Sequence, residues 1–237
     1  MTLPALIIQR MAADGRMTEL IDFYPEYAEN GTYQTAERET ERWMADHVKP
    51  DWWCLDVGAH VGYYTILLSR LAHDGHVVGV EASVHTAAKL RVNIWHNIMA
   101  VAGGWKMIEP TVLQMAVGAV QGVADETLWL TGRGADQGRT PGRYTFTTID
   151  AICQHWPRVD LIKTDVDGWD LEALVGAAEI VKEHRPFIIS EVNHALAWRA
   201  HSMQDVADLI EVWGYDHLVL DGGNPNNWLL FPKERNP

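Results

Sequence analysis

A glycine-containing turn after an apolar segment is the first place where this sequence could carry chemistry. Residues 54–65 read CLDVGAHVGYYT, with Asp56 before a turn that has glycines at Gly58 and Gly62. A dinucleotide loop has the pattern G-x-G-x-x-G, whose second glycine leaves room for a pyrophosphate. His60 stands at that position, and its side chain would crowd a diphosphate. No G-K-[ST] follows, which excludes the phosphate-binding P-loop.

Two acidic residues that end consecutive apolar segments suit a ligand with an amino acid tail and a ribose. Asp56 can accept a hydrogen bond from an ammonium group, and N–H groups of the turn can donate to a carboxylate. Glu81 ends the segment VVGVE, where dinucleotide folds use an acid to bind both ribose hydroxyls. Gly58 would allow a ligand to approach closely, and Gly62 would allow tight helix–strand packing. The combination favours S-adenosylmethionine over a nicotinamide cofactor or a purely structural turn.

The expected contacts with S-adenosylmethionine, whose product is S-adenosylhomocysteine, come from the turn, the second acid and a third apolar segment. Either Tyr63 or Tyr64 would contact the cofactor tail while the other packs. Met115 and Ala116 would form either an apolar wall beside the adenine or ordinary core. The expected cofactor-binding residues are Asp56, Gly58, Ala59, His60, Gly62, Tyr63, Tyr64, Glu81, Ala82, Ser83, Met115, Ala116 and Asp165.

A second group of charged residues lies in IKTDVDGWD, residues 162–170. Lys163 and Asp165 alternate with apolar or neutral residues, so in a strand they share one face. A buried lysine needs a partner, which Asp165 or Glu191 can supply. Asp165 would therefore either orient the methyl acceptor or act as its base, or form a structural ion pair with Lys163.

Further candidates for proton transfer follow the apolar segment FIISEV. Glu191 and His194 would either bind the acceptor and remove its proton, or cap a loop. Asp167 is another carboxylate candidate for the base. The residues that we expect to be catalytic are Lys163, Asp165, Glu191 and His194.

We predict no metal site. DVDGWD places Gly168 at the fourth position, whereas the calcium-binding EF-hand loop needs glycine at the sixth. A divalent metal held by Asp165 and Glu191 from separate strand ends is the alternative.

The composition limits the classes of partner. The chain has 237 residues and a net charge of −13, without a dense cluster of Lys and Arg, which argues against nucleic acid. Two cysteines make no disulfide framework, and the absence of C-x-x-C argues against zinc. The segment MTLPALIIQR lacks the flanks of a signal peptide, and no apolar run is long enough to span a membrane. We expect a cytoplasmic protein with a small-molecule acceptor, no nucleic-acid or membrane partner, and a homodimer as one oligomeric state.

Short apolar runs alternate with amphipathic stretches beyond residue 50, which is typical of a parallel α/β sheet. TLWL and YTFTTI would form a side hairpin or edge strands, and HLVL and NWLLF flank the turn signal DGGNPNN. Strands are expected at 52–57, 76–81, 111–117, 159–165, 187–192, 217–220 and 227–231. Helices are expected at 62–72, 86–99, 169–184 (one or two pieces) and 203–214.

These elements predict a mostly parallel seven-stranded sheet with an antiparallel last strand and helices on both faces, the layout of Rossmann-like methyltransferases. Residues 1–50 are expected to form a helical extension or cap, because Trp43, Met44 and Val48 lie at helical spacing before Pro50. Residues 51–237 would form the methyltransferase domain.

Several blocks in order resemble the FkbM family of S-adenosylmethionine-dependent methyltransferases. LDVGAHVGYYT resembles its first motif, in which His60 replaces the usual Asn, and VEAS its ribose-binding block. RVNIWHN carries Asn93 and Asn97 at the family's spacing, and QMAVG, TTIDAI and NNWLLF resemble later blocks. LIKTDVDGWDLEALVGA resembles its most specific signature, with Asp167 in place of Glu.

The resemblance implies O-methylation of a hydroxyl on a small molecule or a sugar-containing product. The alternatives are a non-catalytic S-adenosylmethionine-binding or scaffold protein, and a methyltransferase that acts on nucleic acid or protein. The motif D/N-P-P-Y/W of adenine-N6 methyltransferases is absent, because DVDG stands in its place.

The acceptor pocket is expected between the N-terminal extension, the loop TGRGADQGRTPGRYT (residues 131–145) and the residues after the fifth strand. Arg133, Arg139 and Arg143 of that loop would either meet an anionic acceptor or belong to a solvated, mobile lid.

Overall fold

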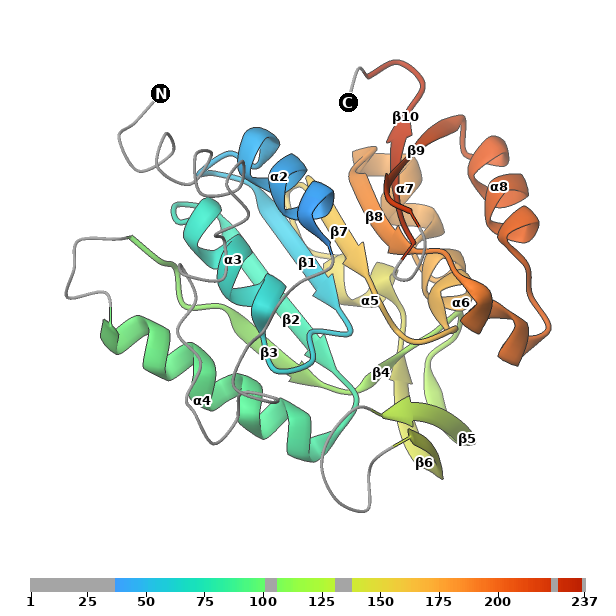
Figure 1. Ribbon diagram of the computed structural model, residues 1–237, viewed down its shortest axis with the longest axis horizontal. Helices are drawn as coiled ribbons and strands as arrows, with labels where there is room; N and C mark the ends of the chain where they lie inside the picture. Colours follow the sequence, from blue (N-terminus) through green and yellow to red (C-terminus); the bar gives the residue numbers. More distant parts are fainter. Residues whose placement is uncertain (1–36, 101–105, 131–137, 223–225, 236–237) are drawn as a thin grey trace.

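The computed structural model describes residues 37–100, 106–130, 138–222 and 226–235. Its main sheet has the strand order β3-β2-β1-β7-β8-β10-β9 (Figure 1). Only β10 runs antiparallel to its neighbours, β8 and β9, which confirms the predicted fold class. The strands are β1 (Trp53–Val57), β2 (His76–Glu81), β3 (Thr111–Gln114), β7 (Leu161–Thr164), β8 (Phe187–Glu191), β9 (Tyr215–Asp221) and β10 (Asn227–Pro232).

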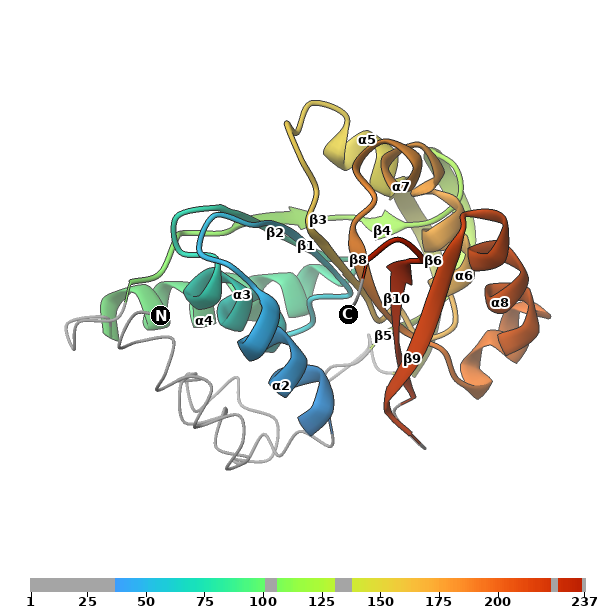
Figure 2. The same cartoon turned by 90° about the horizontal axis from the view of Figure 1, so that it is seen from above.

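Helices cover both faces of this sheet (Figure 2). One face carries α2 (Arg38–His47), α3 (Tyr63–Leu71) and α4 (Val84–Ala100). The remaining helices are α5 (Ile149–Cys153), α6 (Asp170–Val175), α7 (Ala178–His184), α8 (Met203–Val212) and the 3₁₀ helix η4 (His194–Arg199). None of the helices in the described ranges combines the length and apolarity that a membrane span requires.

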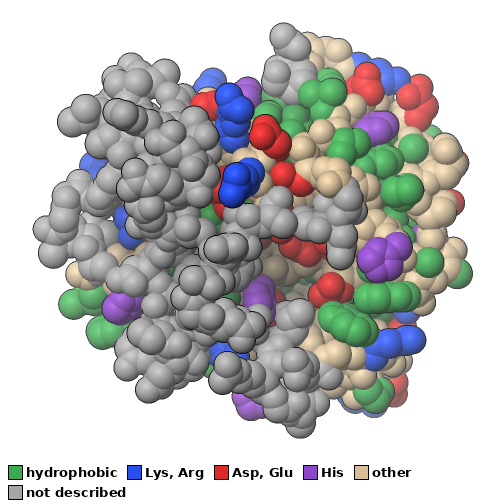
Figure 3. Space-filling view, viewed as in Figure 1, with side chains coloured by type: hydrophobic (Ala, Val, Ile, Leu, Met, Phe, Trp, Pro, Cys, Tyr) green, Lys and Arg blue, Asp and Glu red, His purple; other side chains and the backbone are tan. Residues whose placement is uncertain are grey.

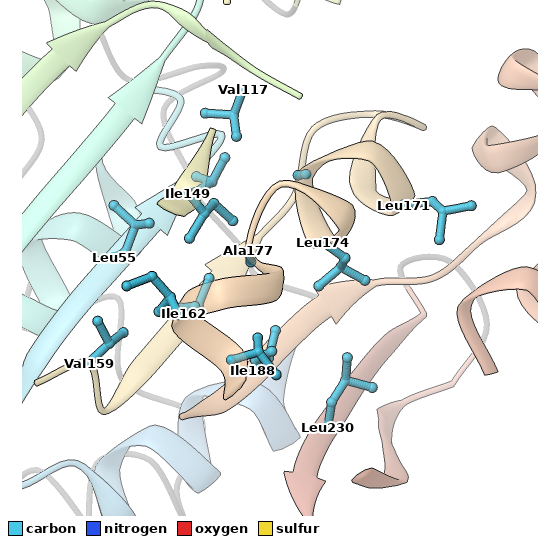
Figure 4. Close-up of a cluster of buried hydrophobic side chains, with 14 of the residues drawn as sticks. Leu55, Val117, Ile149, Val159, Ile162, Leu171, Leu174, Ala177, Ile188 and Leu230 are labelled. Atoms are coloured by element: carbon cyan, nitrogen blue, oxygen red, sulfur yellow. The ribbon is translucent and has the colours of Figure 1, made fainter. Parts of the chain in front are cut away.

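Each helical layer has its own hydrophobic core. Met44, Leu67 and Leu90 represent the cluster under α2, α3 and α4. On the other face, strand residues such as Leu55 and Ile162 pack against helical residues, among them Leu174 (Figure 4). Buried strands with helices on both faces explain why their sequences are apolar throughout rather than alternating.

A second, three-stranded sheet has the order β4-β6-β5, with β4 (Ala116–Val117), β5 (Gly122–Leu130) and β6 (Gly138–Thr147). The expected strand 111–117 is therefore wrong as one element, because the chain leaves the main sheet after Gln114. The expected side hairpin is confirmed as β5–β6, with Leu130 opposite Gly138 at its end.

The predicted loop 131–145 is wrong over residues 138–145, which belong to β6. Its Gly, Pro and Arg content concealed a strand whose residues alternate between exposed and less exposed positions. Pro141 is tolerated because, among the described strands, β6 pairs at that position with β5 alone, so its other edge needs no N–H donor from Pro141. Arg133 lies outside the described residues.

Helix α2 is fixed to the sheet by a carboxylate from the far end of the chain. The Asp221 side chain accepts hydrogen bonds from the backbone N–H groups of Glu39 and Thr40, both at 3.0 Å, and from the Thr40 hydroxyl at 2.6 Å. Trp43 and Met44 then reach the core, as their spacing predicted. The division of the chain near residue 50 stays a prediction.

Replacing Asp221 with Ala should lower the free energy of unfolding by about 1–3 kcal/mol, because it leaves buried donors at the start of α2 without an acceptor. Chemical denaturation measures the change. Asp208→Ala, at an exposed position of α8, is the control and should change the free energy by less than about 0.5 kcal/mol. Equal effects of the two substitutions would contradict this account of α2.

Candidate active site

A cavity of about 210 Å³ opens where β1, β2 and β7 end, the edge at which parallel α/β sheets bind ligands. Acidic side chains gather near the centre of the face shown in Figure 3. The lining residues are Glu37, Asp56, Val57, Gly58, Ala59, His60, Tyr63, Tyr64, Val80, Glu81, Ala82, Met115, Ala116, Val117, Leu128, Trp129, Leu130, Lys163, Asp165, Val166, Asp167 and Trp169. Of the residues that we expected to bind the cofactor, this lining includes all but Gly62 and Ser83.

The glycine turn is shaped by contacts within the chain. A Cβ atom on Gly58, whose φ is +83°, would lie 1.8 Å from the carbonyl oxygen of Asp165. The absent side chain therefore makes room for the Asp165 carbonyl just after β7, and the expected close approach of a ligand to Gly58, which lines the cavity, stays a prediction. A Cβ on Gly62 would lie 2.4 Å from Leu90 of α4, so this glycine serves helix–helix packing instead of helix–strand packing.

Three backbone N–H groups of the turn already donate hydrogen bonds within the chain. The N–H groups of Gly58 and Ala59 both donate to the Val80 carbonyl at 2.9 Å. The N–H of His60 donates to the Glu81 carboxylate at 2.9 Å. These three groups are therefore not the carboxylate donors that the sequence suggested, because the positive φ angles at positions 58 and 60 curl the turn onto β2.

Asp56 is a buried carboxylate with only one of its two oxygens hydrogen-bonded within the described part of the chain. Its Oδ2 accepts a hydrogen bond from the Thr65 hydroxyl at 2.6 Å, whereas its buried Oδ1 has no partner among the described residues. Burial raises the pKa of Asp56, and the nearby Lys163 ammonium opposes that shift. A buried acceptor without a donor is costly in the free protein, which fits a cavity that receives a donor from a ligand.

Glu81 is held in a fixed orientation at the end of β2. One oxygen accepts from the N–H of His60 and the other from the N–H of Ser83, at 2.9 and 2.8 Å. Burial raises the pKa of Glu81, and these hydrogen bonds oppose the shift. Each carboxylate oxygen can accept a further bond, so Glu81 can still receive ribose hydroxyls.

Lys163 is the buried cation of the site, with 1% of its side chain exposed. Its Nζ lies 2.9 Å from Asp165 Oδ2 and 4.5 Å from the centre of the Tyr64 ring. Burial alone would lower the pKa of Lys163, but the carboxylates of Asp165, Glu37 and Asp56 outweigh it and raise the pKa. The ion pair that was the structural alternative for Asp165 is thus present.

Glu37 is a residue of the site that sequence reasoning missed. Its carboxylate accepts hydrogen bonds from the Tyr64 hydroxyl at 2.5 Å and from Asn227 at 3.1 Å. The Tyr63 hydroxyl donates to Glu41 in the same way. Both tyrosines line the cavity, and both bind acids at or before α2. No local sequence pattern predicts this hydrogen bond, because Glu37 and Tyr64 are 27 residues apart and belong to different elements.

The turn after β7 presents Asp167 to the cavity. Asp170, buried and also missed from the sequence, accepts from the N–H groups of Val166 and Gly168, both at 3.4 Å. Asp167 itself has a φ of +49°. Burial first, and then the charge of Asp165, raise the pKa of Asp167 and that of Asp170 to about 7.

Two expected catalytic residues lie outside this cavity. Glu191 ends β8 and is half-buried, and its pKa is raised by burial and then by Asp165. His194 is exposed and its ring faces Trp198, with 6.3 Å between the ring centres. The cap of η4 is Asn193, whose side chain accepts from the N–H of Ala195 at 2.7 Å, so neither candidate has that role.

The described part of the chain contains no group of three His, Cys, Asp or Glu side chains arranged to hold a metal ion. The absence of a metal stays a prediction, as do the roles of the individual site residues.

Comparison with known proteins identifies the family. The Methyltransferase FkbM domain pattern matches residues 56–216, more than half of the chain. The chain belongs to the FkbM methyltransferase family. No curated protein matches the sequence. Family and fold identify a methyltransferase domain, and they support S-adenosylmethionine as the methyl donor.

Solved structures show the same fold. The FkbM methyltransferase of Methylobacillus flagellatus KT superposes with a TM-score of 0.52 at 16% identity, over 93% of this chain and 60% of that one. The precorrin-6y C5,15-methyltransferase of Geobacter metallireducens GS-15 gives 0.52 at 11% identity, over 91% and 95% of the two chains. Our chain thus spans less than two thirds of the length of the FkbM structure that it matches.

Gly58→Ala should destabilise this FkbM domain by about 2–4 kcal/mol, because it combines an unfavourable φ with a clash against the Asp165 carbonyl. Gly138→Ala is a matched control, with a φ of +82° and no described residue within 4 Å of the added Cβ. Its cost should be about 1 kcal/mol, from backbone strain alone. Denaturation curves that give the same loss for both variants would refute the close approach of the turn to β7.

The raised pKa of Asp170 predicts a specific pH dependence. The native carboxyl keeps a proton that the unfolded chain releases, so its contribution to stability is complete below about pH 4. That contribution is lost as the pH rises through about 7, by an amount on the order of 2–4 kcal/mol. Asp170→Asn should therefore lose less stability between pH 5 and pH 8 than the wild type. Urea denaturation at both pH values tests this, with the exposed Asp208→Asn as control.

Proposed function

We propose that the chain is an S-adenosylmethionine-dependent O-methyltransferase that acts on a hydroxyl of a small molecule or a sugar-containing metabolite. The observation that carries the proposal is the pair of acids at adjacent strand ends. Asp56 has a buried oxygen without a partner in the described part of the chain, and Glu81 is oriented by two backbone N–H groups. These groups fit the amino group and the ribose hydroxyls of the donor.

S-adenosylmethionine, when bound, supplies a methyl carbon whose bond to sulfur breaks as the acceptor oxygen bonds to it, and the sulfur keeps the electron pair. Asp56 would hold the amino group and Glu81 the ribose. Met115 and Ala116 line the same cavity and would provide the apolar wall for the adenine.

We assign the removal of the acceptor proton to Asp167. It lines the cavity, and a pKa of about 7 suits a general base near neutral pH. Asp165 is less suited because Lys163 holds it in an ion pair at 2.9 Å. Glu191 and His194 do not line this cavity. The hydroxyl proton would pass to the Asp167 carboxylate as the oxygen forms its new bond.

The rival functions remain a non-catalytic protein of the same fold and a methyltransferase for nucleic acid or protein. A net charge of −13 disfavours nucleic acid. A cytoplasmic location, a small-molecule partner and a homodimer stay proposals from the sequence.

Asp167→Asn should lower kcat about 10²- to 10⁴-fold while leaving the Kd for S-adenosylhomocysteine within about threefold of wild type. Formation of S-adenosylhomocysteine with a panel of hydroxylated acceptors gives kcat, and isothermal titration calorimetry gives the Kd. In the wild type, kcat/KM should rise with pH and level off above about pH 7, as Asp167 loses its proton.

Asp208→Asn is the control for this experiment and should keep both constants. An unchanged kcat in Asp167→Asn would remove Asp167 from the chemistry. Failure of the wild-type protein to bind S-adenosylhomocysteine would overturn the enzymatic function itself.

A further inference from the structure

A second cavity, of about 600 Å³, lies between the β5–β6 hairpin and η4. It is lined by Asp125, Glu126, Thr127, Trp129, Arg139, Pro141, Gly142, Arg143, Asp167, Trp169, Trp198 and Arg199. We call this the hairpin groove. Trp129, Asp167 and Trp169 line the first cavity as well, so the two spaces meet at these side chains. A ligand in the hairpin groove would therefore reach the residue to which we assign proton removal.

Aromatic rings form one part of the groove. Trp129 of β5 and Trp198 of η4 stack with ring centres 4.9 Å apart and 28° between their planes. They remain 38% and 41% exposed, which is unusual for stacked tryptophans that serve only the core. Surface tryptophans that face a cavity offer an apolar plane on which a ring-shaped ligand can lie.

Trp169 and Arg199 form a rigid support behind that surface. The Arg199 guanidinium lies 3.7 Å from the centre of the Trp169 ring. It is also bound to Glu172 at 2.9 Å and to Glu126 at 3.2 Å. Two carboxylates and an aromatic face satisfy this arginine, so its charge is not available to a ligand.

Arg139 and Arg143 differ from Arg199. Both are exposed on β6, opposite Trp129 and Asp125 in the strand register. Within the described ranges, neither guanidinium has an ion pair or side-chain hydrogen bond, even though Arg143 faces a carboxylate across the hairpin. The lining of the groove holds three carboxylates and three guanidiniums, and Arg139 and Arg143 are the two cations in it that remain available to an anionic group.

We propose that the hairpin groove binds the methyl acceptor, and that this acceptor is a sugar ring carrying a carboxylate or phosphate. The inference rests on the proposed function and specifies its substrate. The ring would lie against Trp129 and Trp198, and Arg139 and Arg143 would bind the anionic group through their planar forks. The oxygens of Asp125 and Thr127 would accept hydrogen bonds from ring hydroxyls, which a flat hydrocarbon ligand would not provide.

The test uses isothermal titration calorimetry on the full chain with saturating S-adenosylhomocysteine. Glucose, glucuronate and glucose 6-phosphate are probes that share one ring and differ in the anionic group. At least one anion should bind about tenfold more tightly than glucose, and the stronger of the two identifies carboxylate or phosphate as the preferred group. Added NaCl should weaken the binding of the anionic probe and leave the affinity for glucose unchanged.

Variants assign the binding to the groove. Arg139→Gln and Arg143→Gln should each weaken the preferred anion at least about fivefold without changing the affinity for glucose. Trp198→Ala should weaken the binding of all three probes, because it removes part of the aromatic surface on which their common sugar ring would lie. Lys182→Gln removes an exposed positive charge on α7, outside both cavities, and should change nothing.

The inference would be overturned if no probe binds, if glucose and the anions bind with equal affinity, or if the arginine variants leave anion binding intact. The inference would also be overturned if catechol, a planar neutral probe, binds more tightly than the sugars and its affinity is the same in both arginine variants. The proposed function is judged separately. If S-adenosylhomocysteine binds and the sugars do not, only the assignment of the groove fails.

Discussion

The site depends on one buried ammonium group. Lys163 cannot leave water without carboxylates around it, and the surrounding acids raise its pKa despite its burial. Those acids come from three places: Glu37 before α2, Asp56 on β1 and Asp165 after β7. The Lys163 ammonium group thus interacts with carboxylates from segments that are more than a hundred residues apart in the sequence. It also engages Asp165, which leaves Asp167 as the carboxylate that faces both cavities.

The turn that replaces a dinucleotide loop follows from the same arrangement. Gly58 has no side chain because the Asp165 carbonyl occupies that space, and the turn donates its N–H groups to β2. His60 stands where a dinucleotide loop has the glycine that leaves room for a pyrophosphate. Its backbone N–H donates a hydrogen bond to the carboxylate of Glu81. The turn therefore positions the carboxylates of Glu81 and Asp165, and a ligand would contact side chains more than backbone N–H groups of the turn.

The fold followed from the sequence because apolar segments and amphipathic helices alternate with a clear period. The acids at strand ends, Asp56 and Glu81, were also predictable, since parallel strands end at one edge of a sheet. Glu37 and Asp170 were not, because their partners are set by packing between distant segments or by a turn with left-handed residues. The side hairpin was predictable, but the first part of β6 was not, because its Gly, Pro and Arg residues are typical of a loop and its strand conformation depends on pairing with β5.

The central claim is that the first cavity holds the methyl donor with its reactive end toward Asp167. A crystal structure of the chain with S-adenosylhomocysteine tests this most directly. We predict that the amino group lies beside Asp56 Oδ1, the ribose hydroxyls on Glu81 and the sulfur at the border with the hairpin groove. A nucleoside bound elsewhere, or in the reverse direction with its adenine at Asp167, would contradict it.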